Sequence, residues 1–505
     1  MGDGPLRCKR SPAMENLPFN GSMTIFIYNS LTKKKEEFIP LRAPAVNIYT
    51  CGVTVYDECH LGHARSLYIF EVIRRYLQYR GFKVKFVRNI TDIDDKIINR
   101  GKELNSSWDT VAKKYTDSYY EDLRSLGLSA ADYEPKATEN IPEMIKHIEG
   151  LIKNGYAYES GGDVYFSVRK FKGYGKLSGQ SADQMMAGAR VEPGENKKDV
   201  LDFALWKKSK EGEPSWDSPW GKGRPGWHIE CSTMSMKFLG TPTLDIHAGG
   251  RDLIFPHHEN EIAQAEALTG KPFVKYWIHH GLLTIDSQKM AKSLGNFVTI
   301  KDFINKHGKA DILKLFFLSA HYSHPIDYTQ EKIEAAGKQL KNIEDFFGRV
   351  EQLKSKGKEV RKSKKGKQQL REIEDKFISS MDDDFNMPQA LGWIFELLDR
   401  GNQCIAHGAI AESASIREKM QELLKIFGIE VEKNIIEAGK NIELRFVETV
   451  TIREKMAADI DKKIEERETA RRNKDFARAD EIRKELEAQG IILEDTTSGT
   501  IWRRK

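Results

Sequence analysis

In the first part of the chain, short apolar runs alternate with segments in which apolar residues recur at helical spacing. Between Leu67 and Leu77 they recur every three or four positions, as on one face of a helix, and Gly81 can end that helix. We expect strands at 24–28, 46–50 and 83–87, a helix from Gly62 to about Leu77, and a loop at 88–92. Strand, helix and strand in this order predict a βαβ unit, whose parallel sheet places ligands at the carboxyl ends of its strands.

The pattern becomes mixed after residue 140. Gly161 and Gly162 are typical of a tight hairpin turn, and residues 171–225 are rich in glycine and lysine, as in an insertion that interrupts a sheet. Sheet character then returns. The expected elements are a helix at 142–154, a hairpin at 156–168, strands at 243–247, 274–279 and 282–285, and a helix at 257–268.

After Pro325 the apolar spacing becomes helical. We expect only helices there until a small β-like segment at 490–505, and place them at 330–353, 368–381, 388–400, 412–427, 452–472 and 475–489. A mostly basic run at 354–367 fits either a solvated loop or a loop that faces RNA.

Composition restricts the class of protein. The 505 residues are too many for one core, and 39% hydrophobic residues fit a globular protein. No apolar run reaches the ~18 residues of a membrane span, so we expect no membrane segment. Five scattered cysteines indicate a reducing compartment, not a disulfide framework. Residues 1–22 are irregular and fit a disordered leader, a cloning tag or a weak transit peptide.

Two short signatures, more than 220 residues apart, carry the clearest chemical indication. The first, His-Leu-Gly-His at 60–63, lies where a strand gives way to a helix, so its imidazoles add donors at a helix N-terminus that already favours phosphate. Gly62 lets a nucleotide approach the backbone. The second, Lys-Met-Ala-Lys-Ser at 289–293, offers Lys289 and Lys292 to a triphosphate. Together they predict attack on the α-phosphate of ATP with loss of pyrophosphate.

Cysteine, histidine and acidic residues around these signatures suggest a metal site. Cys51 and Cys231 with an imidazole and a carboxylate suit Zn²⁺. His257 and Glu261 are four apart, so both project from one face of the expected helix. The alternative ligands are Cys59, His258 and Glu259, and buried structural cysteines explain the thiols equally well.

Two other enzyme classes are excluded. The segment 257–261, His-His-Glu-Asn-Glu, lacks the second histidine of the His-Glu-x-x-His metalloprotease motif. No Gly-x-x-x-x-Gly-Lys-Ser/Thr loop occurs, so a P-loop nucleotide site is excluded as well.

Four longer segments, at 49–57, 89–96, 226–231 and 255–261, are more specific than the two signatures. They read Tyr-Thr-Cys-Gly-Val-Thr-Val-Tyr-Asp, Asn-Ile-Thr-Asp-Ile-Asp-Asp-Lys, Gly-Trp-His-Ile-Glu-Cys and Phe-Pro-His-His-Glu-Asn-Glu. With these segments the chain resembles class I cysteinyl-tRNA synthetases along nearly its whole length, from Met23 to Lys505.

The resemblance implies the site residue by residue. It implies one zinc ion per subunit, held by Cys51, Cys231, His257 and Glu261. It implies a cysteine pocket lined by Thr91, Trp227, His247 and Asp252. The implied ATP-binding residues are Gly62, His60, His63 and Lys292, and the implied catalytic residues are His60, His63, Lys289 and Lys292.

The resemblance also implies a fold. We expect an α/β protein with a Rossmann-like parallel-sheet catalytic domain and an insertion, followed by an all-α bundle and a small C-terminal α+β anticodon-binding domain. The expected parts are a leader at 1–22, the first catalytic half at 23–140, the insertion at 141–225, the second catalytic half with the lysine loop at 226–329, a helical tRNA-binding bundle at 330–440, and the anticodon-binding region at 441–505.

The implied activity is that of a cysteine–tRNA ligase. L-cysteine and ATP with magnesium give cysteinyl-adenylate and pyrophosphate, and the cysteinyl group then passes to the 3′ end of tRNA(Cys). Zinc selects cysteine in this scheme because a thiol binds it as thiolate, whereas an alcohol is a poorer ligand. Shape alone separates cysteine from serine poorly, so the metal makes an editing domain unnecessary. A cytoplasmic monomer is expected, with an organellar form as the alternative.

Two departures from the family pattern stand in the signatures. Ala291 replaces the usual serine and Leu61 the usual isoleucine; both lysines remain, so we expect slower loop closure at most. Trp502, followed by two arginines, fits stacking on an unpaired base or, equally well, packing of the tail onto the last helices.

Two alternative functions remain at this stage. A ligase that joins cysteine to an amino sugar needs no anticodon module, and the long region after Gln330 argues against it. A non-catalytic RNA-binding paralogue is expected to have lost histidines, lysines or metal ligands, which are all present here.

Overall fold

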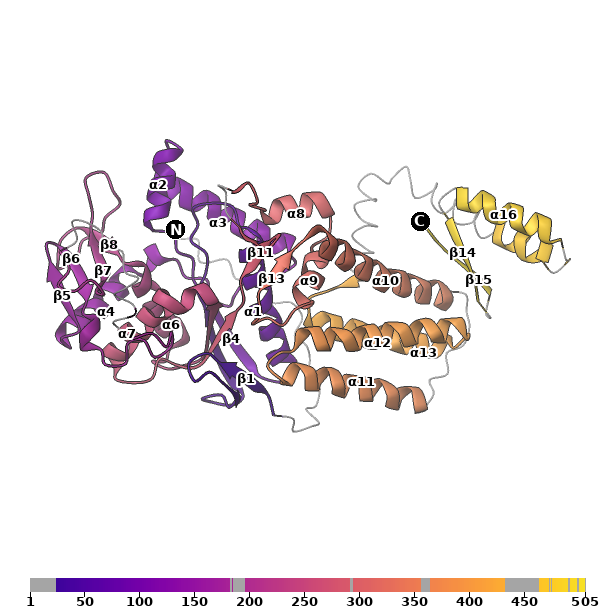
Figure 1. The fold of residues 1–505 in the computed structure, drawn as a ribbon, viewed down its shortest axis with the longest axis horizontal. Helices are drawn as coiled ribbons and strands as arrows, with labels where there is room; N and C mark the ends of the chain where they lie inside the picture. The colour runs from indigo at the N-terminus through magenta and orange to yellow at the C-terminus, as the bar shows by residue number, and fades with distance from the viewer. Residues whose placement is uncertain are drawn as a thin grey trace, which may run out of the picture. The chain divides into compact units, whose positions relative to one another are not determined.

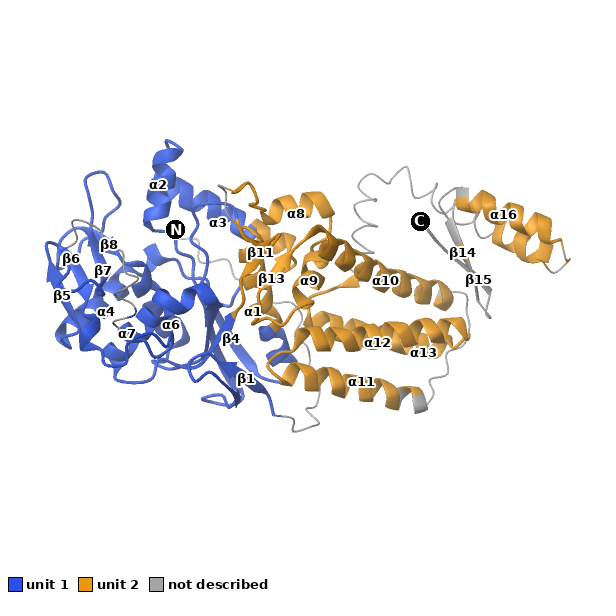
Figure 2. Cartoon of the chain, in the orientation of Figure 1, with its two compact units in different colours: residues 1–58, 73–120, 129–279 blue, residues 59–72, 121–128, 280–505 orange. Residues whose placement is uncertain are grey.

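The computed structural model describes residues 24–181, 184, 196–290, 294–355, 364–431, 463–471, 473, 475–488, 491–496 and 499–504. The chain forms two compact units (Figure 2). The first unit consists of residues 1–58, 73–120 and 129–279, and the second of residues 59–72, 121–128 and 280–505. The expected leader at 1–22 lies outside the described residues.

The first unit is built around a four-stranded sheet (Figure 1). Its strands, in spatial order, are β10 (Val274–His280), β9 (Leu244–Gly250), β3 (Ala45–Thr50) and β4 (Lys83–Arg88). β3 runs parallel to both β4 and β9, which confirms the predicted parallel sheet. Every residue of β9 is buried, as expected for a central strand covered on both faces.

Helix α1 (Leu61–Tyr79) connects β3 to β4 and confirms the predicted βαβ unit. Gly81 follows it with a φ of 86°, a conformation in which glycine meets no Cβ penalty. Most of α1, up to Val72, belongs to the second unit. The α-helices that lie wholly or mainly in the first unit are α2 (Asp95–Glu103), α3 (Trp108–Ser125), α4 (Ile141–Lys153), α6 (Trp227–Leu239) and α7 (Glu259–Thr269). Of these, the sequence pattern predicted α4 and α7.

A second sheet in the first unit is formed by strands between residues 157 and 225, within the expected insertion. β5 (Ala157–Ser160) and β6 (Asp163–Phe166) form the predicted hairpin, and Gly161 and Gly162 turn it with positive φ. β7 (Phe203–Lys208) and β8 (Gly223–Pro225) extend it antiparallel to four strands. Among the remaining residues, β1 (Phe26–Asn29) pairs with β2 (Lys34–Glu37).

The second unit contains a small sheet that leads into the lysine signature. β11 (Leu283–Ile285) pairs antiparallel with β12 (Gln288–Lys289) and parallel with β13 (Ile326–Tyr328). The expectation of helices only after Pro325 is therefore wrong, because β13 is too short to show a periodic pattern. α8 (Ile300–His307) and α9 (Ala310–Leu318) lie between these strands in the chain.

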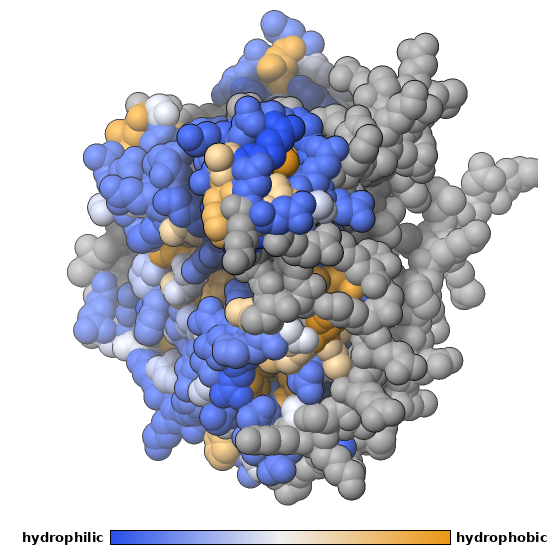
Figure 3. Space-filling view, turned by 90° about the vertical axis from the view of Figure 1, so that its right-hand side faces the viewer, coloured by the Kyte–Doolittle hydropathy of each residue, from blue (hydrophilic) through white to orange (hydrophobic). Residues whose placement is uncertain are grey.

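Four helices follow at the predicted places and are longer than expected. They are α10 (Gln330–Ser355), α11 (Lys364–Asp382), α12 (Met387–Ala406) and α13 (Ile410–Ile426). Phe346, Leu397 and Met420 are among their fully buried side chains. Described residues on the face in Figure 3 are predominantly hydrophilic, which fits helices that bury their apolar stripes.

The chain ends in α16 (Phe476–Ala488) and an antiparallel hairpin of β14 (Ile491–Thr496) and β15 (Gly499–Arg504). This confirms the second helix of the predicted last pair and the β-like end. Parts of the predicted helix at 452–472 and of the basic run at 354–367 lie outside the described residues. Within the described part of the chain, no helix is long and apolar enough to cross a membrane.

Candidate metal centre and nucleotide site

Four predicted ligands meet in the first unit. The ligand atoms of Cys51, Cys231, His257 and Glu261 all lie within 4.8 Å of one another, and the last three side chains are buried. Each comes from a different part of the fold. Cys51 directly follows β3, so it stands at the carboxyl end of a parallel strand, where such sheets bind ligands.

The other three ligands come from segments packed around that strand end. Cys231 lies in the second turn of α6, and its side chain joins the apolar core that also contains Tyr49 of β3. Glu261 lies in the first turn of α7. His257 precedes α7 in η4 (Ile254–His258), a π-helical turn in which Phe255 is extended. The helix predicted at 257–268 therefore begins later, at Glu259.

The later helix start leaves the predicted pairing intact. Nε2 of His257 lies 3.0 Å from Oε1 of Glu261, as expected for neighbours four apart on one face. The thiol of Cys51 lies 3.4 Å from the same oxygen. The spacing argument thus identified a real contact although it misplaced the helix boundary.

A second group shares two of these ligands. Cys51, His247, His258 and Glu261 also bring their ligand atoms within 4.8 Å. This group has one thiol instead of two, so it is the harder of the two donor sets and suits Zn²⁺ less well. Nδ1 of His258 lies 2.8 Å from Nε2 of His279, so Nε2 of His258, which lies 3.3 Å from the Cys51 thiol, is the nitrogen that faces this group.

The remaining alternative ligands are not part of either group. One carboxylate oxygen of Glu259 accepts hydrogen bonds from the backbone N–H groups of Leu177 and Ser178, at 3.1 and 2.8 Å. Glu259 therefore fastens the segment around residue 177. Cys59 is buried but belongs to neither ligand group among the described residues.

The charges of the first group suit a dication. Burial alone would raise the pKa of the Cys231 thiol, but a hydrogen bond from Cys51 and the nearby His257 outweigh it and lower that pKa to about 6. Burial would lower the pKa of His257, yet Glu261 and Cys231 raise it to about 10. The imidazoles of His247 and His257 hold the pKa of Glu261 well below its usual range, against the effect of burial. A thiolate and a carboxylate thus lie side by side.

The proton of the thiol pair stays on Cys51. Burial, a hydrogen bond to Cys231 and its charge all raise the pKa of Cys51 well above its usual value. A metal ion that binds both sulfurs and the His257 imidazole must displace this proton and the one on His257, so metal affinity depends on pH.

The predicted cysteine-pocket residues lie around this group in different ways. The ring of Trp227, at the start of α6, lies 4.1 Å from that of His257, and 37% of the side chain is exposed. His247 on β9 is fully buried, with Nε2 2.8 Å from Oε2 of Glu261. Asp252 lies in the short helix η3 (Arg251–Leu253) and is exposed. Trp227 and His247 thus contact the metal group directly.

The fourth predicted pocket residue, Thr91, belongs to a hydrogen-bond chain that the sequence pattern did not indicate. Its hydroxyl donates to Oε2 of Glu230 at 2.7 Å and accepts from Nδ2 of Asn89 at 3.2 Å. Oδ1 of Asn89 accepts from the backbone N–H of Gly52 at 2.8 Å. The available signal was their place in the quoted segments, where Asn89 lies two residues before Thr91 and Glu230 directly before Cys231.

The two nucleotide signatures meet in the second unit. Leu61 N–H donates to the carbonyl of Val298 at 3.1 Å, and Ile300 N–H donates to the carbonyl of Cys59 at 2.9 Å. His60 forms a bridge with Thr299 between these bonds. The segment that follows the lysine signature is therefore paired with the backbone that begins the histidine signature.

The side chains of the histidine signature are stacked at the start of α1. The rings of His60 and His63 lie 3.8 Å apart, and Nδ1 of His60 accepts from the Gly62 N–H at 3.0 Å. A Cβ on Gly62 would lie 2.7 Å from Cε1 of His60, so glycine is required here by the His60 ring itself. The same Cβ would lie 4.0 Å from Cε of Met290, in the lysine signature.

The lysines of the second signature are only partly described. Lys289 is exposed on β12. Ala291 and Lys292 lie outside the described residues.

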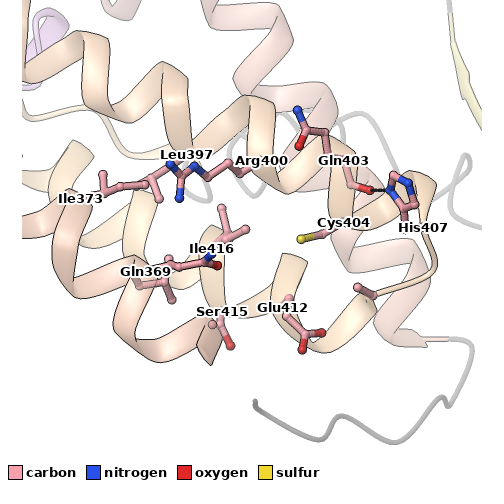
Figure 4. A pocket seen from close by; sticks show the side chains of 13 residues that line it. Gln369, Ile373, Leu397, Arg400, Gln403, Cys404, His407, Glu412, Ser415 and Ile416 are labelled. Atoms are coloured by element: carbon pink, nitrogen blue, oxygen red, sulfur yellow. Dashed lines mark hydrogen bonds between the residues drawn. The ribbon is translucent and has the colours of Figure 1, made fainter. Parts of the chain in front are cut away.

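A cavity of about 510 Å³ occurs elsewhere in the second unit, between α11, α12 and α13 (Figure 4). Its lining includes Ile373 and Cys404 and none of the predicted site residues.

Comparison with known proteins identifies the family. Residues 37–338 match the family described as tRNA synthetases class I (C) catalytic domain, 376–432 match the DALR domain, and 453–503 match the cysteinyl-tRNA ligase anticodon binding domain. The cysteine–tRNA ligase of Anoxybacillus flavithermus is 47% identical over 485 residues, 95% of this chain and 100% of that protein. The chain belongs to the cysteine–tRNA ligase family. The ligase of Aquifex aeolicus is 48% identical over 509 residues, 96% of this chain and 99% of that relative.

Solved structures show the fold of this family member in more distant proteins. A methionyl-tRNA synthetase of Mycobacterium tuberculosis in complex with methionyl-adenylate superposes with a TM-score of 0.57 at 14% identity, over 76% of this chain and 90% of that chain. The predicted class I α/β fold, with its parallel sheet and helical C-terminal region, is therefore confirmed.

Proposed function

We propose that this protein is a cysteine–tRNA ligase, which activates L-cysteine with ATP and transfers it to the 3′ end of tRNA(Cys). The observation that carries the proposal is the convergence of Cys51, Cys231, His257 and Glu261 in a member of this ligase family. Two thiols, an imidazole and a carboxylate in a mostly buried site can hold a thiol-binding metal, which is what selection of a thiol-bearing amino acid requires.

In this proposal the four residues hold one zinc ion per subunit. Two sulfurs, an imidazole and a carboxylate are the donors that Zn²⁺ prefers. When bound, zinc supplies a Lewis acid that favours the deprotonated form of a thiol, so cysteine binds as thiolate whereas serine is a poorer ligand. Thr91, Trp227, His247 and Asp252 line the cysteine pocket, and the first three lie in the contact network of the metal group.

The nucleotide signatures perform the activation step. The carboxylate of cysteine attacks the α-phosphorus of ATP, the bond from that phosphorus to the bridging oxygen breaks, and pyrophosphate leaves with magnesium. His60, His63, Lys289 and Lys292 stabilise the charge on the phosphates, and Gly62, whose missing Cβ leaves room for the His60 ring, contributes to ATP binding beside them. Backbone hydrogen bonds between residues 59–61 and 298–300 support these roles, because they hold the segment that follows the lysine signature beside the histidine signature.

The later parts of the chain bind tRNA in this proposal. Residues 330–440 contact the body of the tRNA, and residues 441–505 read its anticodon, in line with the DALR and anticodon binding domains matched there. The protein works as a monomer in the cytoplasm, which sedimentation of the purified chain and fractionation of cells will test.

The test is cysteine-dependent exchange of pyrophosphate into ATP by zinc-replete protein, followed by charging of a total tRNA pool. The variant Cys231→Ala should lose zinc and reduce the preference for cysteine over serine by roughly 100-fold or more. Cys404→Ala, which removes a thiol from the cavity in Figure 4, is the matched control. It should leave the zinc content and the preference for cysteine over serine unchanged. Unchanged discrimination in Cys231→Ala refutes selection by zinc. Exchange without charging favours the amino-sugar ligase instead.

A further inference from the structure

Arg65 is a buried cation that bonds to two separate segments of the second unit. Its Nη1 donates to the carbonyls of Gly281 and Leu282, both at 2.8 Å. Its Nη2 donates to the carbonyls of Tyr322 at 3.2 Å and His324 at 2.6 Å. The side chain is fully buried (0% exposed). A single guanidinium therefore ties together four carbonyls that lie more than 200 residues away along the chain.

The bonded segments frame the nucleotide signatures. Arg65 lies two residues after His63 on α1. Gly281 and Leu282 lead directly into β11, which turns back through β12 to Lys289. Tyr322 and His324 precede β13, the parallel neighbour of β11. The same side chain thus joins the helix of the histidine signature to both strands that support the lysine signature.

The backbone at this junction has no spare room. A Cβ on Gly281 would lie 2.2 Å from both the carbonyl carbon and the oxygen of His324. The carbonyl of Gly281 also accepts from Nδ1 of His280 at 2.8 Å. Burial lowers the pKa of Arg65 to about 10, so the guanidinium remains charged at neutral pH. Four carbonyl dipoles stabilise that charge, which makes the contact specific to a planar, multiply donating cation.

We propose that Arg65 is a positioning residue for adenylate formation, which sets the distance between the His60–His63 turn and the hairpin that carries Lys289. Phosphoryl chemistry depends on the placement of cationic groups, and displacements of about 1 Å cost on the order of 100-fold in rate. Lysine cannot replace this guanidinium, because an ammonium group is compact and cannot span four carbonyls in one plane. The inference rests on the proposed function for the identity of the reaction.

The main test compares Arg65→Lys with Arg80→Lys in the full-length, zinc-replete protein. Arg80 is also buried, just beyond the far end of α1, and donates to the Tyr76 hydroxyl, so it controls for the same substitution at a buried site. We expect Arg65→Lys to lower kcat for cysteine-dependent pyrophosphate exchange about 100-fold and to raise KM for ATP, while zinc content and KM for cysteine stay unchanged. Arg80→Lys should keep kcat and both KM values.

A second variant covers the case in which Arg65→Lys does not fold. Arg65→Ala leaves a space for a free guanidinium ion, and millimolar guanidinium should restore exchange in this variant. The same guanidinium concentration should leave the rate of Arg80→Ala, which has no loss to recover, unchanged. Wild-type kcat and KM for ATP in Arg65→Lys, with only a lower Tm, would overturn the proposal, as would folded Arg65→Ala that guanidinium does not rescue. If the wild-type protein shows no cysteine-dependent exchange, it is the proposed function that fails.

Discussion

Nε2 of His247 lies 2.8 Å from Oε2 of Glu261, and neither side chain is exposed to solvent. Because Oε2 is engaged by His247, the carboxylate is turned so that Oε1 faces His257 and Cys51. This is the usual arrangement of a partner that orients a metal-binding carboxylate. The two elements involved, β9 and α7, belong to the same unit.

We predict that His247→Gln lowers the zinc affinity of the protein by roughly 10- to 100-fold. The amide can still donate to Oε2, but it holds the carboxylate less firmly than the imidazole does. Competition with a chromophoric chelator measures the affinity. His147→Gln, which changes a buried histidine bonded to Thr233 outside the metal group, is the control. Equal affinities in the two variants contradict the orienting role of His247.

Removal of the metal should abolish activity reversibly. Dialysis against a strong chelator is expected to end cysteine-dependent exchange, and zinc should restore it, because the thiol-binding centre is lost while the protein fold remains. The thermal midpoint should also rise with zinc concentration, since a ligand that binds only the folded state stabilises it. Elemental analysis must show metal-free protein; full exchange by such protein refutes the assignment.

Two glycines on α12 should respond to alanine in opposite ways. A Cβ on Gly392 meets nothing within 4 Å, so Gly392→Ala should stabilise the protein by about 0.5–1 kcal/mol through lower chain entropy in the unfolded state. A Cβ on Gly401 would lie 2.4 Å from the Phe346 ring, so Gly401→Ala should cost about 1–3 kcal/mol through overpacking. Urea denaturation measures both changes, and a neutral Gly401→Ala contradicts the close packing of α10 on α12.

The stability of the first unit should fall in mild acid because of His147. Burial lowers the pKa of His147 to about 4, whereas an unfolded histidine titrates near 6.5. Below about pH 6.5 the unfolded chain therefore binds a proton that the folded chain does not, and stability is lost as the pH falls toward 4. We expect a loss of about 2 kcal/mol from this group between pH 7 and pH 5.

Denaturation midpoints at pH 7 and pH 5 test this prediction. The amide in His147→Gln can still bond to Thr233 and Gln264, so the variant should fold normally. Its free energy of unfolding should lose the part of the pH dependence that comes from His147 and keep the part that comes from the other histidines. Parallel pH profiles for the variant and the wild type would show that His147 is already protonated, or unburied, in the folded protein.

Much of the fold followed from local pattern. The parallel βαβ unit, the Gly161–Gly162 hairpin and the helices after Gln330 were predicted because their apolar spacing is long and regular. β13 and β8 were missed because three residues cannot display a period. The boundary before Glu259 was misplaced because a π-helical turn keeps helical side-chain spacing without being part of the α-helix.

The donor types of the candidate site were likewise evident in the sequence, and their grouping was not. Cys51, Cys231, His257 and Glu261 were proposed together, but His258 was an equal rival by spacing. Only the folded chain shows that both sets converge, and that the set with His258 contains one thiol instead of two. The order of strands in the sheet decides which distant residues become neighbours, and residue periodicity does not encode that order.

By itself, the sequence determined which chemistry this protein can perform, because thiols, imidazoles and lysines carry that chemistry wherever they lie. It also determined most local elements, which depend on neighbours a few positions away. The tertiary structure alone decided that Arg65, an unremarked residue of α1, bonds to carbonyls at 281–282, 322 and 324. The physical reason is that backbone carbonyls are the same for every residue type, so no sequence pattern marks the four that accept from a distant guanidinium.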